Sequence, residues 1–174
     1  ANIDYHVFAP RRPNENPAEG AIRDIKLRWY RLQTKRSIPD RLWDFGISYV
    51  CETGNVIPTS SKYKGRTPIE CITGDTPDIS EYTDFGFYDW VMFRNNAGLG
   101  IAEIGRWIGV SRRVGQLMSY WILPSSCIPI SCTTVQRVTE AEKETEEFKE
   151  RMKIFTEKVE SRLGDHVKAA EIPA

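Results

Sequence analysis

The spacing of apolar residues changes once along this chain, near Phe85, and that change limits the folds it can adopt. Before this point apolar side chains recur three or four residues apart, as in amphipathic helices. After it they alternate within short segments separated by turn residues, as in strands. We therefore expect an α+β chain, with helices first and a small antiparallel β-barrel after them.

The stretch 10–36 predicts a proline-rich loop followed by a basic helix. Asn16 can cap this helix through its side-chain oxygen, and Pro17 suits the first helical position, where no N–H is needed. Apolar residues four and three apart predict one buried face: Ala18, Ile22, Ile25, Trp29 and Leu32. At about 100° per residue, the flank beside this face carries Glu19, Arg23, Lys26 and Tyr30.

Glu19 has two interpretations from the residues alone. It stands three positions after Asn16, so it suits a capping box and the positive end of the helix dipole. It also lies at the head of a basic, partly aromatic flank at the edge of the expected core, which is one form that a nucleic-acid site can take. Such a flank alone is more often a solvated helix face than a nucleic-acid site.

Two further helices are predicted before Phe85. The first runs from Pro39 to about Thr53 and is ended by Gly54 and Asn55. The second is short and has a cap, a first-position proline and a stop glycine, which are Thr67, Pro68 and Gly74. The acidic stretch 76–84 is predicted to be a solvated linker and a domain boundary, because its carboxylates lack the spacing of a calcium loop.

Four strands and a final helix are predicted after Phe85. The strands are Phe87–Arg94, Gly105–Ser111, Leu117–Leu123 and Pro129–Val135. The helix runs from Thr139 to Leu163, with Thr139 and Glu142 as a capping box and Gly164 as a stop. Its narrow apolar seam is expected to pack on a helix, on the barrel or on a second copy.

Charge is uneven along a chain whose net charge is zero. Residues 11–41 and 94–113 are basic and residues 70–89 are acidic, so any affinity for nucleic acid must come from local patches. The four cysteines show no CxxC spacing and the two histidines lie at opposite ends, which argues against a zinc site and for an intracellular protein. No apolar run approaches the roughly 20 residues of a membrane span.

Several motifs occur in an order typical of one family. The segment 13–19, PNENPAE, resembles the P-x-N-x-N-x-x-E segment that carries the last carboxylate of the DDE triad in retroelement integrases; Asn14, Asn16 and Glu19 match it, and its proline position is Arg12 here. Downstream, GRTPIE at 65–70, TGDTPDI at 73–79 and GRWIGVS at 105–111 resemble runs of copia-type retrotransposon polyproteins, including those of diatoms. The resemblance covers roughly residues 1 to 138.

This resemblance implies a fold in three parts. Residues 1–84 would be the C-terminal, helical part of an RNase H-like integrase core. Residues 85–138 would be a small barrel of the SH3 or chromodomain type, and 139–174 an amphipathic helix and tail. We expect such a chain to be a piece of a longer polyprotein.

The resemblance also implies DNA integration by metal-dependent phosphoryl transfer, a nucleotidyltransferase reaction. Glu19 would be the third carboxylate that holds Mg²⁺ or Mn²⁺, with two Asp residues upstream of this chain. We therefore expect this chain alone to bind DNA without joining it. The implied partners are the element ends, target DNA and further copies of the protein, in the nucleus or a virus-like particle.

The residues expected to contact DNA are mostly basic: Arg11, Arg12, Arg23, Lys26, Tyr30, Arg94, Arg106, Arg112 and Arg113. An alternative is a non-catalytic module that binds chromatin or a protein through the barrel. Four aromatic residues would then line a groove or a cage for methylated lysine, namely Trp90, Trp107, Tyr120 and Trp121. The same residues suit a barrel core, which is the interpretation that we prefer for Trp107 and Trp121.

Overall fold

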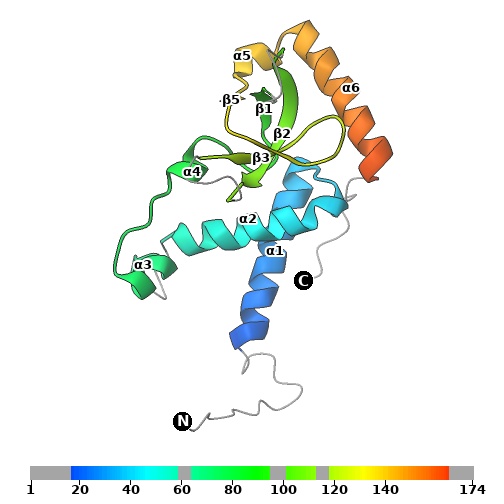
Figure 1. Cartoon of the computed structure of the whole chain (residues 1–174). Coiled ribbons are helices and arrows are strands. Elements are labelled where there is room, and N and C mark those ends of the chain that lie inside the picture. Colours follow the sequence, from blue (N-terminus) through cyan, green and yellow to red (C-terminus); the bar gives the residue numbers. More distant parts are fainter. Residues whose placement is uncertain (1–16, 59–63, 95–100, 113–117, 165–174) are drawn as a thin grey trace.

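The computed structural model describes residues 17–58, 64–94, 101–112 and 118–164, and it has the expected α+β fold (Figure 1). The helices are α1 (Pro17–Arg36), α2 (Trp43–Val56), α3 (Pro68–Thr73), α4 (Ser80–Thr83), α5 (Glu140–Lys143) and α6 (Glu146–Leu163), with a 3₁₀ turn at Asp40–Leu42. The strands are β1 (Trp90–Phe93), β2 (Glu103–Val110), β3 (Tyr120–Leu123), β4 (Ile130–Cys132) and β5 (Val135–Arg137). None of the helices in these ranges is long and apolar enough to cross a membrane.

The five strands form one antiparallel sheet in the order β4-β3-β2-β1-β5. Strands β1 to β4 form a meander in which each strand pairs with the next, and β5 returns to pair with β1. Met92 in β1 therefore lies between Ile104 of β2 and Gln136 of β5. This arrangement places β4 and β5 at opposite edges of the sheet.

Three of the predicted strands differ clearly from the observed ones. The first begins at Trp90 instead of Phe87, because Tyr88 adopts a left-handed backbone conformation with φ of 68°. The third begins at Tyr120, and its predicted start at Leu117 lies outside the described residues. The segment 129–135, predicted as one strand, contains all of β4 and the first residue of β5. Because β4 and β5 lie at opposite edges, the chain must leave the sheet between them, at Thr133 and Thr134.

Helices α1 and α2 cross where a glycine meets a tryptophan. Trp29 is buried, and a Cβ atom at Gly46 would overlap carbons Cζ3 and Cη2 of its ring. Glycine is therefore required for the close approach of the two helices. Helix α1 ends at Arg36, as predicted, whereas α2 continues past Gly54 and Asn55 to Val56.

The predicted apolar face of α1 is buried only along its C-terminal half. Trp29 is buried and Ile25 is half-buried, but Ala18 is exposed and Ile22 is 52% exposed. Trp43 at the start of α2 is 61% exposed. The described residues thus leave apolar surface uncovered at both places.

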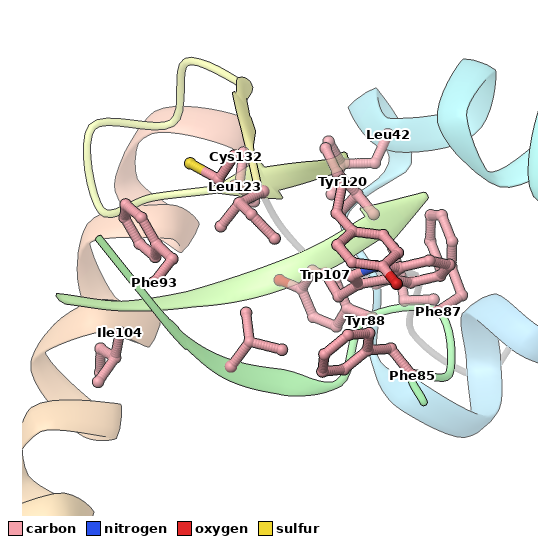
Figure 2. Packing of buried hydrophobic residues seen from close by; sticks show 14 of the residues in the cluster. Leu42, Phe85, Phe87, Tyr88, Phe93, Ile104, Trp107, Tyr120, Leu123 and Cys132 are labelled. Atoms are coloured by element: carbon pink, nitrogen blue, oxygen red, sulfur yellow. The ribbon is translucent and has the colours of Figure 1, made fainter. Parts of the chain in front are cut away.

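The hydrophobic core joins α1 and α2 to the sheet (Figure 2). Trp107 of β2 is fully buried, and Tyr49 of α2 packs edge-on against it with ring centroids 5.7 Å apart. The ring of Phe87 packs against the rings of Trp29 and Tyr49, with centroid distances of 5.7 and 5.2 Å respectively. Packing is therefore continuous across residue 84, where we predicted a domain boundary from sequence.

Residues 64–84 contain two short helices. The prediction for α3 is confirmed, because Thr67 and Glu70 form a reciprocal capping box and Gly74 ends the helix with φ of 85°. The acidic linker contains α4, and two of its residues bind the rest of the protein. The hydroxyl of Tyr82 donates to Glu52 at 2.8 Å, and Glu81 pairs with Arg112 at 3.0 Å.

The C-terminal helix predicted over 139–163 is split in two. Thr139 and Glu142 form the predicted capping box at the start of α5, but Thr145 then caps a new helix, α6, by accepting from the N–H of Phe148. The apolar seam of α6 packs on the sheet. Phe155 lies edge-on to Trp90, with ring centroids 5.1 Å apart.

Candidate nucleic-acid interface

Helix α1 carries an exposed basic flank. Its 20 residues include six basic and two acidic side chains, a net charge of +4. Glu19, Arg23 and Lys26 are exposed and Tyr30 is half-buried. In Figure 1 the N-terminal half of α1 projects away from α2 and the sheet, so this flank is open along the first turns.

Glu19 lies in the first turn of α1, as predicted. The strands that the structure describes lie at the other end of the helix (Figure 1). Glu19 is exposed, beside the uncovered Ile22. The predicted cap residue, Asn16, lies outside the described residues.

The carboxylate of Glu19 does not by itself fit a metal site. Across the ranges that the structure describes, no three His, Cys, Asp or Glu side chains gather into a group that could hold a metal ion. A two-metal site for phosphoryl transfer requires several carboxylates. These residues therefore do not fit Mg²⁺ or Mn²⁺ without ligands from elsewhere.

Arg106 is unsuited to the phosphate contact expected of it. Its guanidinium carbon lies 3.4 Å from the ring centroid of Trp90 and 4.4 Å from that of Tyr88. Its Nη1 donates to the Tyr88 carbonyl at 2.9 Å, and burial lowers the pKa of Arg106 to about 10. A buried, stacked guanidinium stabilises the sheet, so we remove Arg106 from the proposed DNA-contacting set.

The other arginines predicted to contact DNA from the sheet region differ in whether their guanidinium groups are already paired. Arg94 directly follows β1 and is exposed. Arg112 has 60% of its side chain exposed, but it pairs with Glu81 and also donates to the Tyr82 hydroxyl at 3.1 Å. Three more of the expected contacts lie outside the described residues, namely Arg11, Arg12 and Arg113.

The four aromatic residues expected to line one groove are dispersed. Trp107 and Tyr120 are buried in the core (Figure 2), and Trp90 lies between Arg106 and Phe155. Trp121 is half-buried and packs edge-on to Phe45 of α2, with ring centroids 6.0 Å apart. The structure therefore does not form the alternative aromatic cage, and Trp107 lies in the core, as we preferred from sequence.

A groove that the sequence did not reveal lies along α2. Three of its polar lining residues, Asp44, Ser48 and Glu52, are four residues apart and so share one helix face. This spacing is visible in the sequence, but the opposing wall from β2 and β3 is not.

Burial raises the pKa of Tyr82 to about 12, with its hydrogen bond to Glu52 as the second cause, so this hydroxyl stays protonated as a donor at neutral pH.

Comparisons with models of protein families, with curated proteins and with solved structures found no match.

Proposed function

We propose that this chain is the DNA-binding, C-terminal region of a copia-type retrotransposon integrase. One observation carries the proposal: the exposed head of α1 presents Glu19, Arg23 and Lys26 on a single flank, beside an uncovered apolar stripe. Basic side chains on an open helix face can bind the phosphates of a duplex. In the complete protein, the rest of a catalytic core would pack on the exposed Ile22.

The fold supports the same proposal. Two crossing helices precede a small antiparallel sheet, which is the order implied by an integrase core followed by a small barrel. A meander whose fifth strand pairs with the first also suits an SH3-like barrel. The motifs at 13–19, 65–70, 73–79 and 105–111 occur in the order of the family.

Glu19 is, in this proposal, the third carboxylate of a DDE site that a longer polyprotein completes. This chain alone is then a DNA-binding unit without strand-transfer activity. The complete protein would act on element ends and target DNA as an oligomer, in the nucleus or a virus-like particle.

Glu19→Gln in that longer polyprotein tests the catalytic part of the proposal. Glutamine keeps the shape of the side chain but lacks the charge that a divalent cation requires, so strand transfer should fall by at least about 10²-fold. Joining of a labelled element end to a target duplex measures it. DNA affinity of this chain should not fall, because the change removes a negative charge.

Asp24→Asn is the matched control, because Asp24 is an exposed acid of the same helix that lies away from the flank. It should leave strand transfer within about twofold. Unchanged strand transfer in Glu19→Gln would contradict the catalytic role of Glu19. It would not decide DNA binding by the flank of α1, which the salt dependence of DNA affinity tests separately.

A further inference from the structure

A groove of about 610 Å³ lies between α2 and the β2–β3 pair. Its size falls within the range of ligand-binding clefts in proteins. The wall from α2 includes Phe45 and Tyr49, and the facing wall includes Trp121 of β3. We call this feature the α2 groove.

A β-bulge shapes the sheet side of the α2 groove. The pairing of β2 with β3 shifts register between Trp107 and Gly109, and Gly109 has φ of 135°, which favours glycine. A Cβ atom at Gly109 would find no other atom within 4 Å. The groove is therefore open space beside the bulge, and no side chain of the described residues fills it there.

Two half-buried aromatic rings meet in the groove. Phe45 and Trp121 lie edge to face, with ring centroids 6.0 Å apart and planes inclined by 72°. A cation that approaches such rings is attracted by the electrons of their faces. Aliphatic stems of lysine or arginine would also pack on these rings.

The charge of the groove selects a cationic ligand. Helix α2 carries Asp44 and Glu52 on the groove face and contains no basic residue. The groove continues into a second hollow of about 330 Å³, which Glu52 shares with Asp78 and Glu81. Among the described residues that line the two hollows, Arg112 is the one with a positive charge. Its guanidinium forms an ion pair with Glu81 and donates a hydrogen bond to the Tyr82 hydroxyl.

This surplus of carboxylates excludes a nucleic-acid occupant. The phosphates of a nucleic acid in this groove would lie beside the carboxylates of Asp44 and Glu52, and these negative charges would repel one another. The basic flank of α1 and the acidic α2 groove therefore suit ligands of opposite charge.

The spacing of the carboxylates indicates the form of the ligand. Asp44 and Glu52 are eight residues apart on α2, which is about 12 Å along the helix axis. An extended peptide covers about 13 Å in four residues, and residues four apart point to the same side. Two basic residues four apart in an extended peptide would therefore match the two carboxylates.

We propose that the α2 groove binds an extended basic segment of a protein partner, with lysine or arginine residues four apart. One cationic side chain lies against Phe45 and Trp121 near Asp44, and the other lies near Glu52. Oε2 of Glu52 accepts from the Tyr82 hydroxyl, and its other oxygen would make this contact. This function goes beyond DNA binding and rests on different residues.

The test uses the full chain and a fluorescein-labelled peptide in which two lysines, four residues apart, are separated by alanine and glycine. Fluorescence anisotropy should show binding at least about tenfold tighter than to the same peptide with both lysines replaced by glutamate. A short DNA duplex added as competitor should not displace the peptide. Absence of binding, equal binding of the two peptides or displacement by the duplex would each overturn the proposal.

Asp44→Asn/Glu52→Gln should weaken lysine-peptide binding about tenfold, because both carboxylates are lost while Gln can still accept from Tyr82. Glu147→Gln/Glu157→Gln, on the exposed surface of α6, removes the same charge and should change the affinity less than twofold. Equal effects of the two double variants would contradict a specific site.

Ser48→Arg adds a cation inside the groove without truncating any contact, and it should abolish peptide binding while circular dichroism stays unchanged. Sedimentation of the unaltered chain and of Ser48→Arg tests whether the groove is instead occupied by a second copy of this chain. If the unaltered chain is a dimer and Ser48→Arg is a monomer, the groove belongs to a second copy and the proposal of a separate partner is wrong.

Discussion

At the scale of single residues, the environment of an arginine decides its role. Arg106 and Arg94 are both basic residues of the sheet region, and the sequence suggested the same phosphate contact for both. Arg106 is stacked between Tyr88 and Trp90, whereas Arg94 is exposed. Only the pairing of β1 with β2 brings those rings to Arg106, so no local pattern could have predicted its burial.

Arg106→Lys should destabilise the protein by about 1–3 kcal/mol, because an ammonium cannot cover both rings as a planar guanidinium does. Urea denaturation followed by tryptophan fluorescence measures the change. Arg94→Lys, on an exposed side chain, should stay within about 0.5 kcal/mol of the unaltered protein. Similar effects of the two substitutions would show that the stack around Arg106 contributes little.

Tyr82 gives a prediction about alkaline pH. Burial, followed by its hydrogen bond to Glu52, raises the pKa of Tyr82 to about 12, above its ordinary value of 10.0. A group whose pKa is higher in the folded state stabilises the protein below the unfolded pKa, and that stabilisation is lost as pH rises through the folded pKa. The loss should therefore fall between about pH 10 and pH 12.

Tyr82→Phe should lose less stability than the unaltered protein across this interval, by up to about 1 kcal/mol after allowance for the partial exposure of the hydroxyl. Urea unfolding at about pH 9 and about pH 12 gives the comparison, and the other tyrosines are the same in both proteins. Identical pH dependence in the two proteins would contradict the link between Tyr82 and Glu52.

At the scale of elements, the ends of α3 were predictable from sequence and the edges of the sheet were not. The start and stop of α3 depend on Thr67, Pro68 and Gly74, all of which act locally. The separation of β4 from β5 depends on which edge of the sheet each one joins, which is decided by distant residues. The break before α6 is marked by a local cap, Thr145, that the sequence prediction of one continuous helix missed.

The crossing of α1 and α2 depends on one glycine. Gly46→Ala should destabilise the protein by about 1–3 kcal/mol or more, because the new methyl group would overlap the buried ring of Trp29. Gly20→Ala, within α1, should instead stabilise it by about 0.5–1 kcal/mol, since nothing lies within 4 Å of the added carbon. Thermal unfolding of both variants tests the pair, and a loss of stability in Gly20→Ala would show that α1 is not a helix there.

At the scale of the whole molecule, two neighbouring helices carry opposite charge. Helix α1 has a net charge of +4, whereas α2 has two acids and no basic residue. The zero net charge of the sequence hides this division. The basic flank of α1 could be predicted from helical periodicity alone, but the α2 groove requires contact between Phe45 and Trp121, which are far apart in the sequence.

The uncovered apolar surface also belongs to this scale. Ile22 was predicted to be buried and is 52% exposed, and Trp43 is 61% exposed. The periodicity that predicted the burial of Ile22 also suits a face that packs on a partner. In our proposal that partner is the remainder of an integrase core.

The salt dependence of DNA binding by this chain tests the central proposal most directly. Fluorescence anisotropy with a labelled duplex should give an affinity that falls linearly with salt on logarithmic axes. Arg23→Ala/Lys26→Ala should reduce that slope by about 1.8, because two phosphate contacts are lost. Arg31→Ala/Lys35→Ala removes the same charge from the opposite, exposed side of α1 and should leave the slope nearly unchanged. An affinity that does not depend on salt, or equal slopes for the two double variants, would contradict DNA binding by the flank of α1.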